Sequence, residues 1–147
     1  AYGGSGNDNL LVYGGSGYGG PGDDELWYQT KDAVLLDGGE GWDLATWLDA
    51  PARLVLDLVT GKALVGKSAV SVGGLEDVVG TRFDDVLRGD DNANKLSGVL
   101  GNDKLFGRGG DDQIWGGSEY EEATSGDLAD GGEGTDQCDA PTTVACE

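Results

Sequence analysis

Aliphatic residues recur every nine positions in the second half of the chain. From Gly80, four consecutive blocks read GTRFDDVLR, GDDNANKLS, GVLGNDKLF and GRGGDDQIW, with leucine or isoleucine at the eighth position of each. The first six positions are rich in glycine, aspartate and asparagine, which favour turns. Each block therefore predicts a tight turn followed by a short strand that carries one apolar side chain.

A strand of this kind cannot bury its apolar side chain alone, whereas stacked strands can. If two blocks make one coil, residues eighteen apart lie above one another, about 4.8 Å away across parallel strands. The block after Gly116 carries six extra residues, GGSEYEEATSGDLAD, and resumes at Asp127. The sixth block positions then form two columns, one of Asp85, Asp103 and Asp127 and the other of Asn94, Asp112 and Asp136.

Stacked carboxylates repel one another unless a cation lies between them. Glycine turns leave backbone carbonyl oxygens accessible, and ligation by oxygen alone favours calcium over zinc or copper. The alternative is a solvated acidic surface with glycine turns, but the fixed spacing between the polar and the aliphatic positions favours metal. We expect several Ca2+ ions, held by backbone carbonyls of the Gly-rich turns and by the side chains of Asp8, Asp24, Asp43, Asp85, Asn94, Asp103, Asp112, Asp127 and Asp136.

The pattern is less regular in the first half of the chain. Asp8, Asp24 and Asp43 lie in similar blocks but are 16 and 19 residues apart, which leaves the coil register there open. Residues 47–74 lack the glycine and aspartate motif and alternate apolar residues from Leu54, which predicts strands that bend or widen the coil without metal. We expect one solenoid domain over 1–147, with irregular repeats in 3–46, the metal-free segment 47–74, regular repeats in 75–139 with an insertion at about 119–125, and a tail at 140–147.

The blocks resemble the nonapeptide G-G-x-G-x-D-x-U-x of RTX (repeats-in-toxin) proteins, a calcium-binding repeat. GGSGNDNLL from Gly3, GGPGDDELW from Gly19 and the four blocks from Gly80 carry the resemblance, which covers about residues 3–46 and 73–139. It implies an all-β fold, a right-handed parallel β-roll or β-solenoid of short strands and Gly-Asp turns with an irregular central segment. It also implies a small, secreted bacterial protein, since the cytosol holds too little calcium to fill such sites.

The composition excludes several function classes. The net charge of −19 and the 29 glycines oppose a compact fold unless something neutralises the acids. Without histidine there is no Ser-His-Asp relay, no His-ligated zinc and no imidazole acid or base, so we expect no enzyme and no small-molecule substrate. So acidic a chain is repelled by nucleic acids and anionic membranes, and no apolar run approaches the ~18 residues of a membrane span.

The two ends of the chain carry further expectations. Cys138 and Cys146 are eight positions apart without CxxC spacing, which predicts a disulfide that folds the tail over the last coil of an exported protein. Because Ala1 is not an initiating Met, we expect a removed signal peptide or an excised fragment, and a terminus at Glu147 favours a complete small protein. The first block follows at once, with no capping helix, so we expect identical units to stack head to tail.

We therefore expect an extracellular calcium-binding structural protein that folds on Ca2+ and associates with itself into a fibre or surface layer. One alternative is the C-terminal RTX domain of a larger exported enzyme or toxin, where it assists folding and secretion. Another is an adhesin-type solenoid. A β-roll that kept its structure in a chelator would contradict the calcium-folding hypothesis common to these roles.

Overall fold

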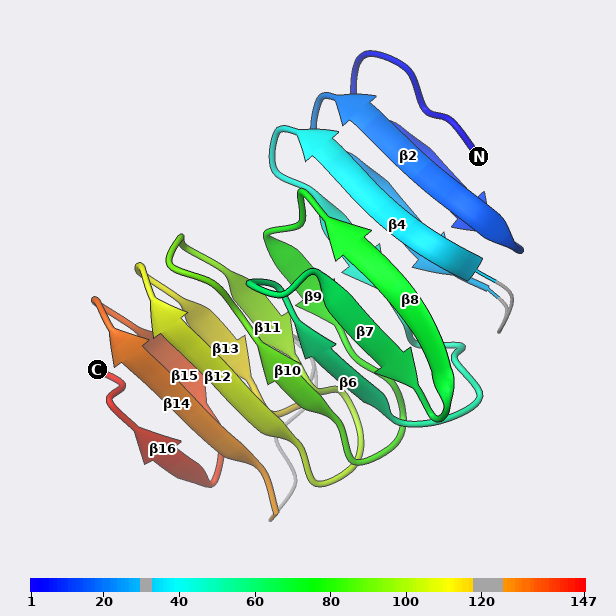
Figure 1. Ribbon diagram of the computed structural model, residues 1–147. Coiled ribbons are helices and arrows are strands. Elements are labelled where there is room, and N and C mark those ends of the chain that lie inside the picture. The colour runs from blue at the N-terminus through cyan, green and yellow to red at the C-terminus, as the bar shows by residue number, and fades with distance from the viewer. Residues whose placement is uncertain (30–32, 118–125) are drawn as a thin grey trace.

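The computed structural model describes residues 1–29, 33–117 and 126–147. Within these ranges every regular element is a β-strand, and the strands form two facing sheets with mainly parallel pairing (Figure 1). The expected all-β roll is confirmed. No helix in the described ranges is long and apolar enough to cross a membrane. The insertion expected at about 119–125 lies outside the described residues.

The chain alternates between the two sheets, so that successive coils extend both. In the described part of the chain, one sheet has seven strands, in the order β1 (Asn9–Val12), β3 (Glu25–Tyr28), β5 (Leu44–Thr46), β9 (Asp77–Val79), β11 (Lys95–Ser97), β13 (Gln113–Trp115) and β15 (Gln137–Asp139). The other, over the same ranges, has nine, in the order β16 (Thr142–Val144), β14 (Leu128–Glu133), β12 (Lys104–Gly109), β10 (Val86–Arg88), β6 (Leu54–Asp57), β7 (Lys62–Val65), β8 (Ser68–Gly73), β4 (Ala33–Glu40) and β2 (Gly15–Pro21).

The strand register confirms that two nine-residue blocks make one coil. Val86 of β10 lies opposite Lys104 of β12, eighteen residues on, and β11 pairs with β13 at the same spacing. In the next coil Lys104 lies opposite Leu128, and β13 and β15 shift by the same amount. The six extra residues therefore leave the stacking in register on both sheets.

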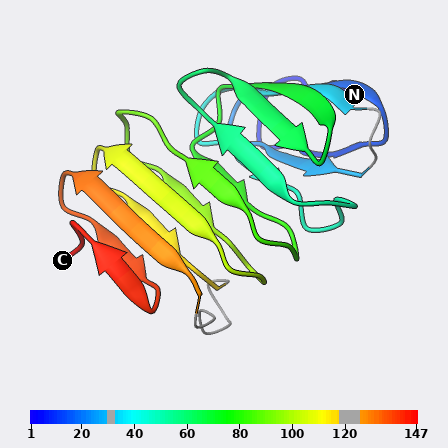
Figure 2. The same cartoon turned by 60° about the horizontal axis from the view of Figure 1, so that its bottom comes forward.

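A three-strand meander interrupts the repeating coils. β7 pairs antiparallel with both β6 and β8, while β6 pairs in parallel with β10 and β8 in parallel with β4. On the other sheet, β5 and β9 are direct neighbours. One sheet is therefore wider by two strands, or roughly 10 Å at the usual strand spacing. The roll bends to accommodate the difference: the row of strands changes direction at the meander in Figure 1, and Figure 2 shows the two parts from another side.

The core is a thin layer between the two sheets. The middle residue of each short strand points inward, so that Leu87 stacks on Leu105 and Leu96 on Ile114, all fully buried. A buried side chain of this size contributes roughly 1.5–3 kcal/mol, which is little per coil against the cost of ordering so many glycines. The core also holds two large aromatic side chains, and Trp47 stacks on Tyr28 with ring centroids 4.7 Å apart.

Candidate metal centre

Polar residues form a column along each of two edges of the roll, where the chain passes from one sheet to the other. In the described residues, the long column holds the residues just before the strands of the seven-stranded sheet, namely Asp8, Asp24, Asp43, Glu76, Asn94, Asp112 and Asp136. The short column precedes β10, β12 and β14 and holds Asp85, Asp103 and Asp127. Asp8 and Glu76 are partly buried, and all the others are at most 2% exposed.

Hydrogen bonds between coils join the members of each column. The backbone N–H of Asp8 donates to Asp24 Oδ1 at 2.8 Å, and that of Asp24 donates to Asp43 Oδ1 at 2.7 Å. The N–H groups of Asn94 and Asp112 donate in the same way to the side chain one coil on, and so do those of Asp85 and Asp103 in the short column. One oxygen of each accepting carboxylate is thus committed to the ladder.

The three N-terminal acids belong to the long column despite their irregular spacing. Asp43 N–H donates to Glu76 Oε2 at 2.8 Å, and the Asn94 side-chain amide donates to the Glu76 carbonyl at 3.4 Å. Glu76 therefore connects the N-terminal acids with the regular repeats across the meander. Sequence reasoning missed it, although it lies eighteen residues before Asn94 and two before the buried Val78.

The second oxygen of most ladder carboxylates is buried without a hydrogen-bond donor. Within the described residues, this holds for Oδ2 of Asp8, Asp24, Asp43, Asp103, Asp112 and Asp136. A buried carboxylate oxygen with no donor is costly unless a proton or a cation compensates for it. The repeat of the same unsatisfied oxygen from coil to coil indicates a repeated ligand.

The pKa values of the column carboxyls reflect this burial. Removal from water, reinforced by neighbouring carboxylates, raises the pKa of Asp103 from 3.8 to about 7. The same causes raise the pKa of Asp43 and of Asp112 to about 6, and burial also raises the pKa of Glu76 and of Asp85. Without a cation, the roll therefore disfavours the charged form of these carboxyls relative to the unfolded chain.

The glycine that opens each turn brings a further oxygen to the same point. A Cβ built on Gly3 would lie 2.6 Å from Asp8 Oδ2 and 2.7 Å from the carbonyl oxygen of Gly19 in the next coil. Gly19, Gly98 and Gly107 show the same convergence of a carboxylate oxygen and a glycine carbonyl. Glycine is required there because these two oxygens occupy the space that a side chain would need.

These residues fit Ca2+. In the part of the chain that the structure describes, no three Asp, Glu, Cys or His side chains gather closely enough to hold an ion by themselves. Backbone carbonyls must therefore supply the remaining ligands, and calcium, which accepts six to eight oxygen ligands in irregular geometry, suits such a mixed set. Zinc and copper prefer histidine and cysteine ligands. The sequence has no histidine, and the described residues include no free cysteine.

Two predicted ligands have different surroundings from the rest. Asp85 accepts hydrogen bonds on both oxygens, from Leu54 N–H and from the N–H and hydroxyl of Thr81. The side-chain amide of Asn94 is also satisfied, since its oxygen accepts from Asp90 N–H at 2.8 Å and its nitrogen donates to Glu76. Asp127 accepts from Asp103 N–H at 2.9 Å.

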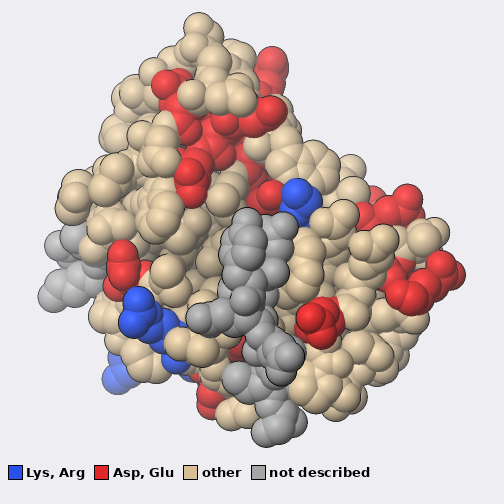
Figure 3. Space-filling view, turned by 180° about the vertical axis from the view of Figure 1, so that it is seen from behind, with Lys and Arg blue, Asp and Glu red and all other residues tan. Residues whose placement is uncertain are grey.

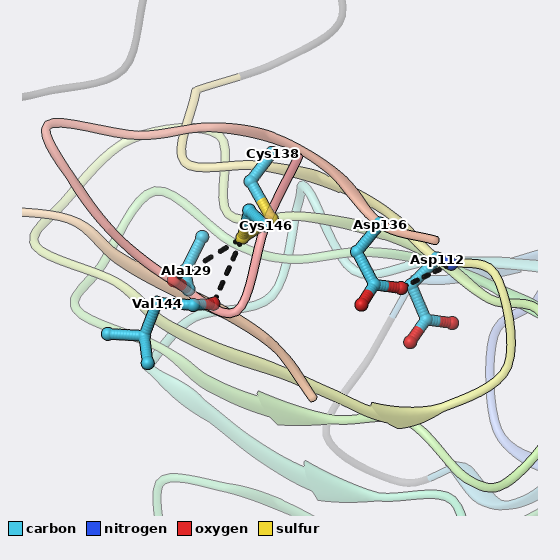
Figure 4. The surroundings of a disulfide bond; sticks show 6 residues. All are labelled: Asp112, Ala129, Asp136, Cys138, Val144 and Cys146. Atoms are coloured by element: carbon cyan, nitrogen blue, oxygen red, sulfur yellow. Dashed lines mark hydrogen bonds between the residues drawn. A yellow bond between two sulfur atoms is a disulfide. The ribbon is translucent and has the colours of Figure 1, made fainter. Parts of the chain in front are cut away.

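The predicted disulfide is confirmed. Cys138 in β15 is bonded to Cys146, with Cα atoms 5.7 Å apart (Figure 4). Cys138 takes the apolar place of its block, opposite Ile114. The bond thus fixes the C-terminal residues against the last coil, where β16 pairs with β14.

Comparison with known proteins is consistent with this geometry. Residues 72–105 and 88–119 match the family model of the RTX calcium-binding nonapeptide repeat (4 copies). The matched residues run from β8 to just beyond β13 and so include members of both columns. No curated protein matches the chain.

Proposed function

We propose that the chain, in which residues 72–119 match the RTX calcium-binding nonapeptide repeat, is an extracellular structural protein that folds as it binds calcium. The observation that carries the proposal is the ladder of buried carboxylates whose second oxygen has no donor in the described residues. An ion that binds the coiled chain but not the unfolded chain converts its binding energy into folding energy.

The size of this linkage is sufficient to decide whether the chain folds. At a calcium concentration of about 100 times Kd, one site adds about 2.7 kcal/mol to the folding free energy. A domain is stable by only about 5–15 kcal/mol, so a few such sites are decisive. The net charge of −19 adds self-repulsion that bound cations reduce, and Figure 3 shows acidic side chains gathered in patches on one face with few basic ones.

An extracellular location agrees with the chemistry. Extracellular modules bind calcium with Kd of about 10⁻⁴–10⁻³ M, far above cytosolic levels. RTX repeat proteins are typically exported, and the disulfide between Cys138 and Cys146 suits an oxidising compartment. The proposal assigns no catalytic step to the chain, because its buried acids are committed to the ladder.

Calcium removal tests the folding proposal. We expect the full chain in a chelator to lose most of its far-UV circular dichroism β-signal and to expand in size-exclusion chromatography, and both changes to reverse on adding calcium. Asp112→Asn should raise the calcium concentration at the folding midpoint several-fold, whereas Asp139→Asn, which removes the same charge from an exposed position, should leave it nearly unchanged. A chain equally compact in chelator and in calcium would overturn the proposal.

We also propose that the folded chain associates with itself end to end. In the described residues, β1 and β15 are the outermost strands of the seven-stranded sheet, and β16 ends the other sheet at the C-terminal side. Outermost strands have backbone groups available to a further strand, and a head-to-tail contact between unlike ends generates a filament or a ring. Leu11 of β1, in the N-terminal coil, is 48% exposed.

Light scattering on the calcium-loaded chain tests this association. We expect mass to rise with protein concentration, and Leu11→Lys to lower the associated fraction. Val59→Lys is the matched control, since Val59 is exposed in the loop between β6 and β7, away from both ends. A calcium-loaded monomer at every concentration would contradict a fibre and favour a folding and secretion domain.

A further inference from the structure

Two successive turns, residues 80–85 and 89–94, are bonded differently from the turns that begin at Gly3 and Gly98. At Gly4 and Val99, the second residue of the turn donates its N–H to a glycine carbonyl in the next coil. Thr81 and Asp90 hold the same position, but their N–H groups donate back to the side chain that ends their own turn, Asp85 and Asn94. These two turns are closed on themselves.

Within turn 80–85, Thr81 satisfies the carboxylate that other turns leave unsatisfied. Its hydroxyl donates to Asp85 Oδ1 at 2.9 Å and accepts from Phe83 N–H at 3.0 Å, and the side chain is fully buried. Leu54 N–H adds a further bond to Asp85 Oδ1 at 2.7 Å. Both oxygens of Asp85 therefore have protein donors, which a cation would have to displace.

Within turn 89–94, charge and donors both disfavour a divalent cation. Asn94 brings no negative charge, and its amide is already bonded on both sides. The guanidinium of Arg108 donates to the Gly89 carbonyl at 2.7 Å and binds both carboxylate oxygens of Asp57, at 3.0 and 2.6 Å. The carbonyl of the glycine that opens this turn is thus bonded to a fixed positive charge, while the glycine carbonyl that lies beside Asn94 Oδ1 is that of Gly107.

We infer that calcium does not bind at these two turns and that the calcium sites form two separate groups. One group lies at Asp8, Asp24 and Asp43, and the other at Asp103, Asp112 and Asp136. Between the two groups, Thr81 and Arg108 donate hydrogen bonds to oxygen atoms of the turns in place of an ion. The meander and the adjoining β10 and β11 are therefore stable without metal. This inference rests on the proposed calcium binding and adds which turns take part. It removes Asp85 and Asn94 from the set of calcium ligands.

Calcium stoichiometry of matched variants tests the inference. Isothermal titration of the full chain should give one ion fewer for Asp103→Asn than for the unaltered chain. Asp85→Asn, one coil away in the same column, should bind as many ions as the unaltered chain. If Asp85→Asn folds in saturating calcium by circular dichroism and still loses an ion, the inference is wrong.

A gain-of-site variant keeps the inference testable if Asp85→Asn does not fold. The double variant Asn94→Asp with Arg108→Gly restores the usual acid of turn 89–94 and the usual glycine at the second position of turn 107–112, from which Arg108 reaches the Gly89 carbonyl, and we expect it to bind one ion more. An unchanged stoichiometry in that folded variant would overturn the assignment of this turn. If the unaltered chain binds no calcium, the proposed function itself fails, which is a separate outcome.

Discussion

Most of the buried aspartates in the two columns have two distinct tasks. One oxygen accepts a backbone N–H from the neighbouring coil, as Asp136 Oδ1 does from Asp112 at 2.9 Å, and so fixes the stacking distance. The other oxygen is left buried without a donor, as in Asp112 and Asp103. A glutamine or leucine at these positions would offer no second carboxylate oxygen to a cation and would alter the bond to the backbone N–H of the neighbouring coil. A carboxylate of the length of aspartate serves both purposes.

The raised pKa values predict opposite pH dependences with and without calcium. In chelator, the folded chain holds protons more tightly than the unfolded one, because the pKa of Asp103 is raised to about 7 and those of Asp43 and Asp112 to about 6. Stability from these groups is fully present below about pH 4 and is lost as pH rises through 6 to 7. Circular dichroism in chelator should therefore show more β-structure at pH 4 than at pH 8.

Calcium reverses this trend because it competes with the same protons. The calcium concentration at half-saturation should rise as pH falls from 8 to 5. Measurements should not go below pH 4, since Arg108 lowers the pKa of Asp57 and that ion pair contributes stability that is lost only at lower pH. A β-signal in chelator that does not vary with pH, or tighter calcium binding at pH 5, would contradict the prediction.

At the level of elements, the sequence predicts the regular coils because their register depends only on local spacing. The eighteen-residue period places Asp103 on Asp85 and Asp112 on Asn94, and both stackings are observed. The N-terminal register was not predictable from the sequence. The coils there depart from the eighteen-residue spacing, and the chain compensates for the difference outside the long column. Where β2 meets β4, for example, the pairing shifts between Gly15 and Ser16.

The meander shows a second limit of periodicity. Alternating apolar residues predict its strands, and Gly66-Lys67 forms a two-residue hairpin turn between β7 and β8. The pattern does not tell which sheet receives the extra strands. Nor could it reveal the guanidinium bound to the Gly89 carbonyl, because Arg108 is held there by Asp57, fifty-one residues away in the chain. Contacts between coils, not local sequence, decide these features.

At the scale of the whole molecule, the roll is close to one-dimensional. Each coil contacts its neighbours above and below, so stability is approximately a sum of coil terms and neighbour terms. In the described chain the nine-stranded sheet is continuous across the meander, while on the other edge Glu76 links the two parts of the long column. A perturbation at one end should therefore weaken mainly the adjoining coils.

The disulfide offers a direct test of this locality. Replacing Cys138 and Cys146 together by alanine removes a closure of the last coil that is worth roughly 2–4 kcal/mol in a cooperatively unfolding chain. In a one-dimensional roll the loss should appear as faster hydrogen exchange in β15 and β16, with β1 and β3 at the opposite end unchanged. Reduction of the unaltered chain should give the same result in calcium. Equal acceleration in all strands would instead show that the roll unfolds as a single cooperative unit.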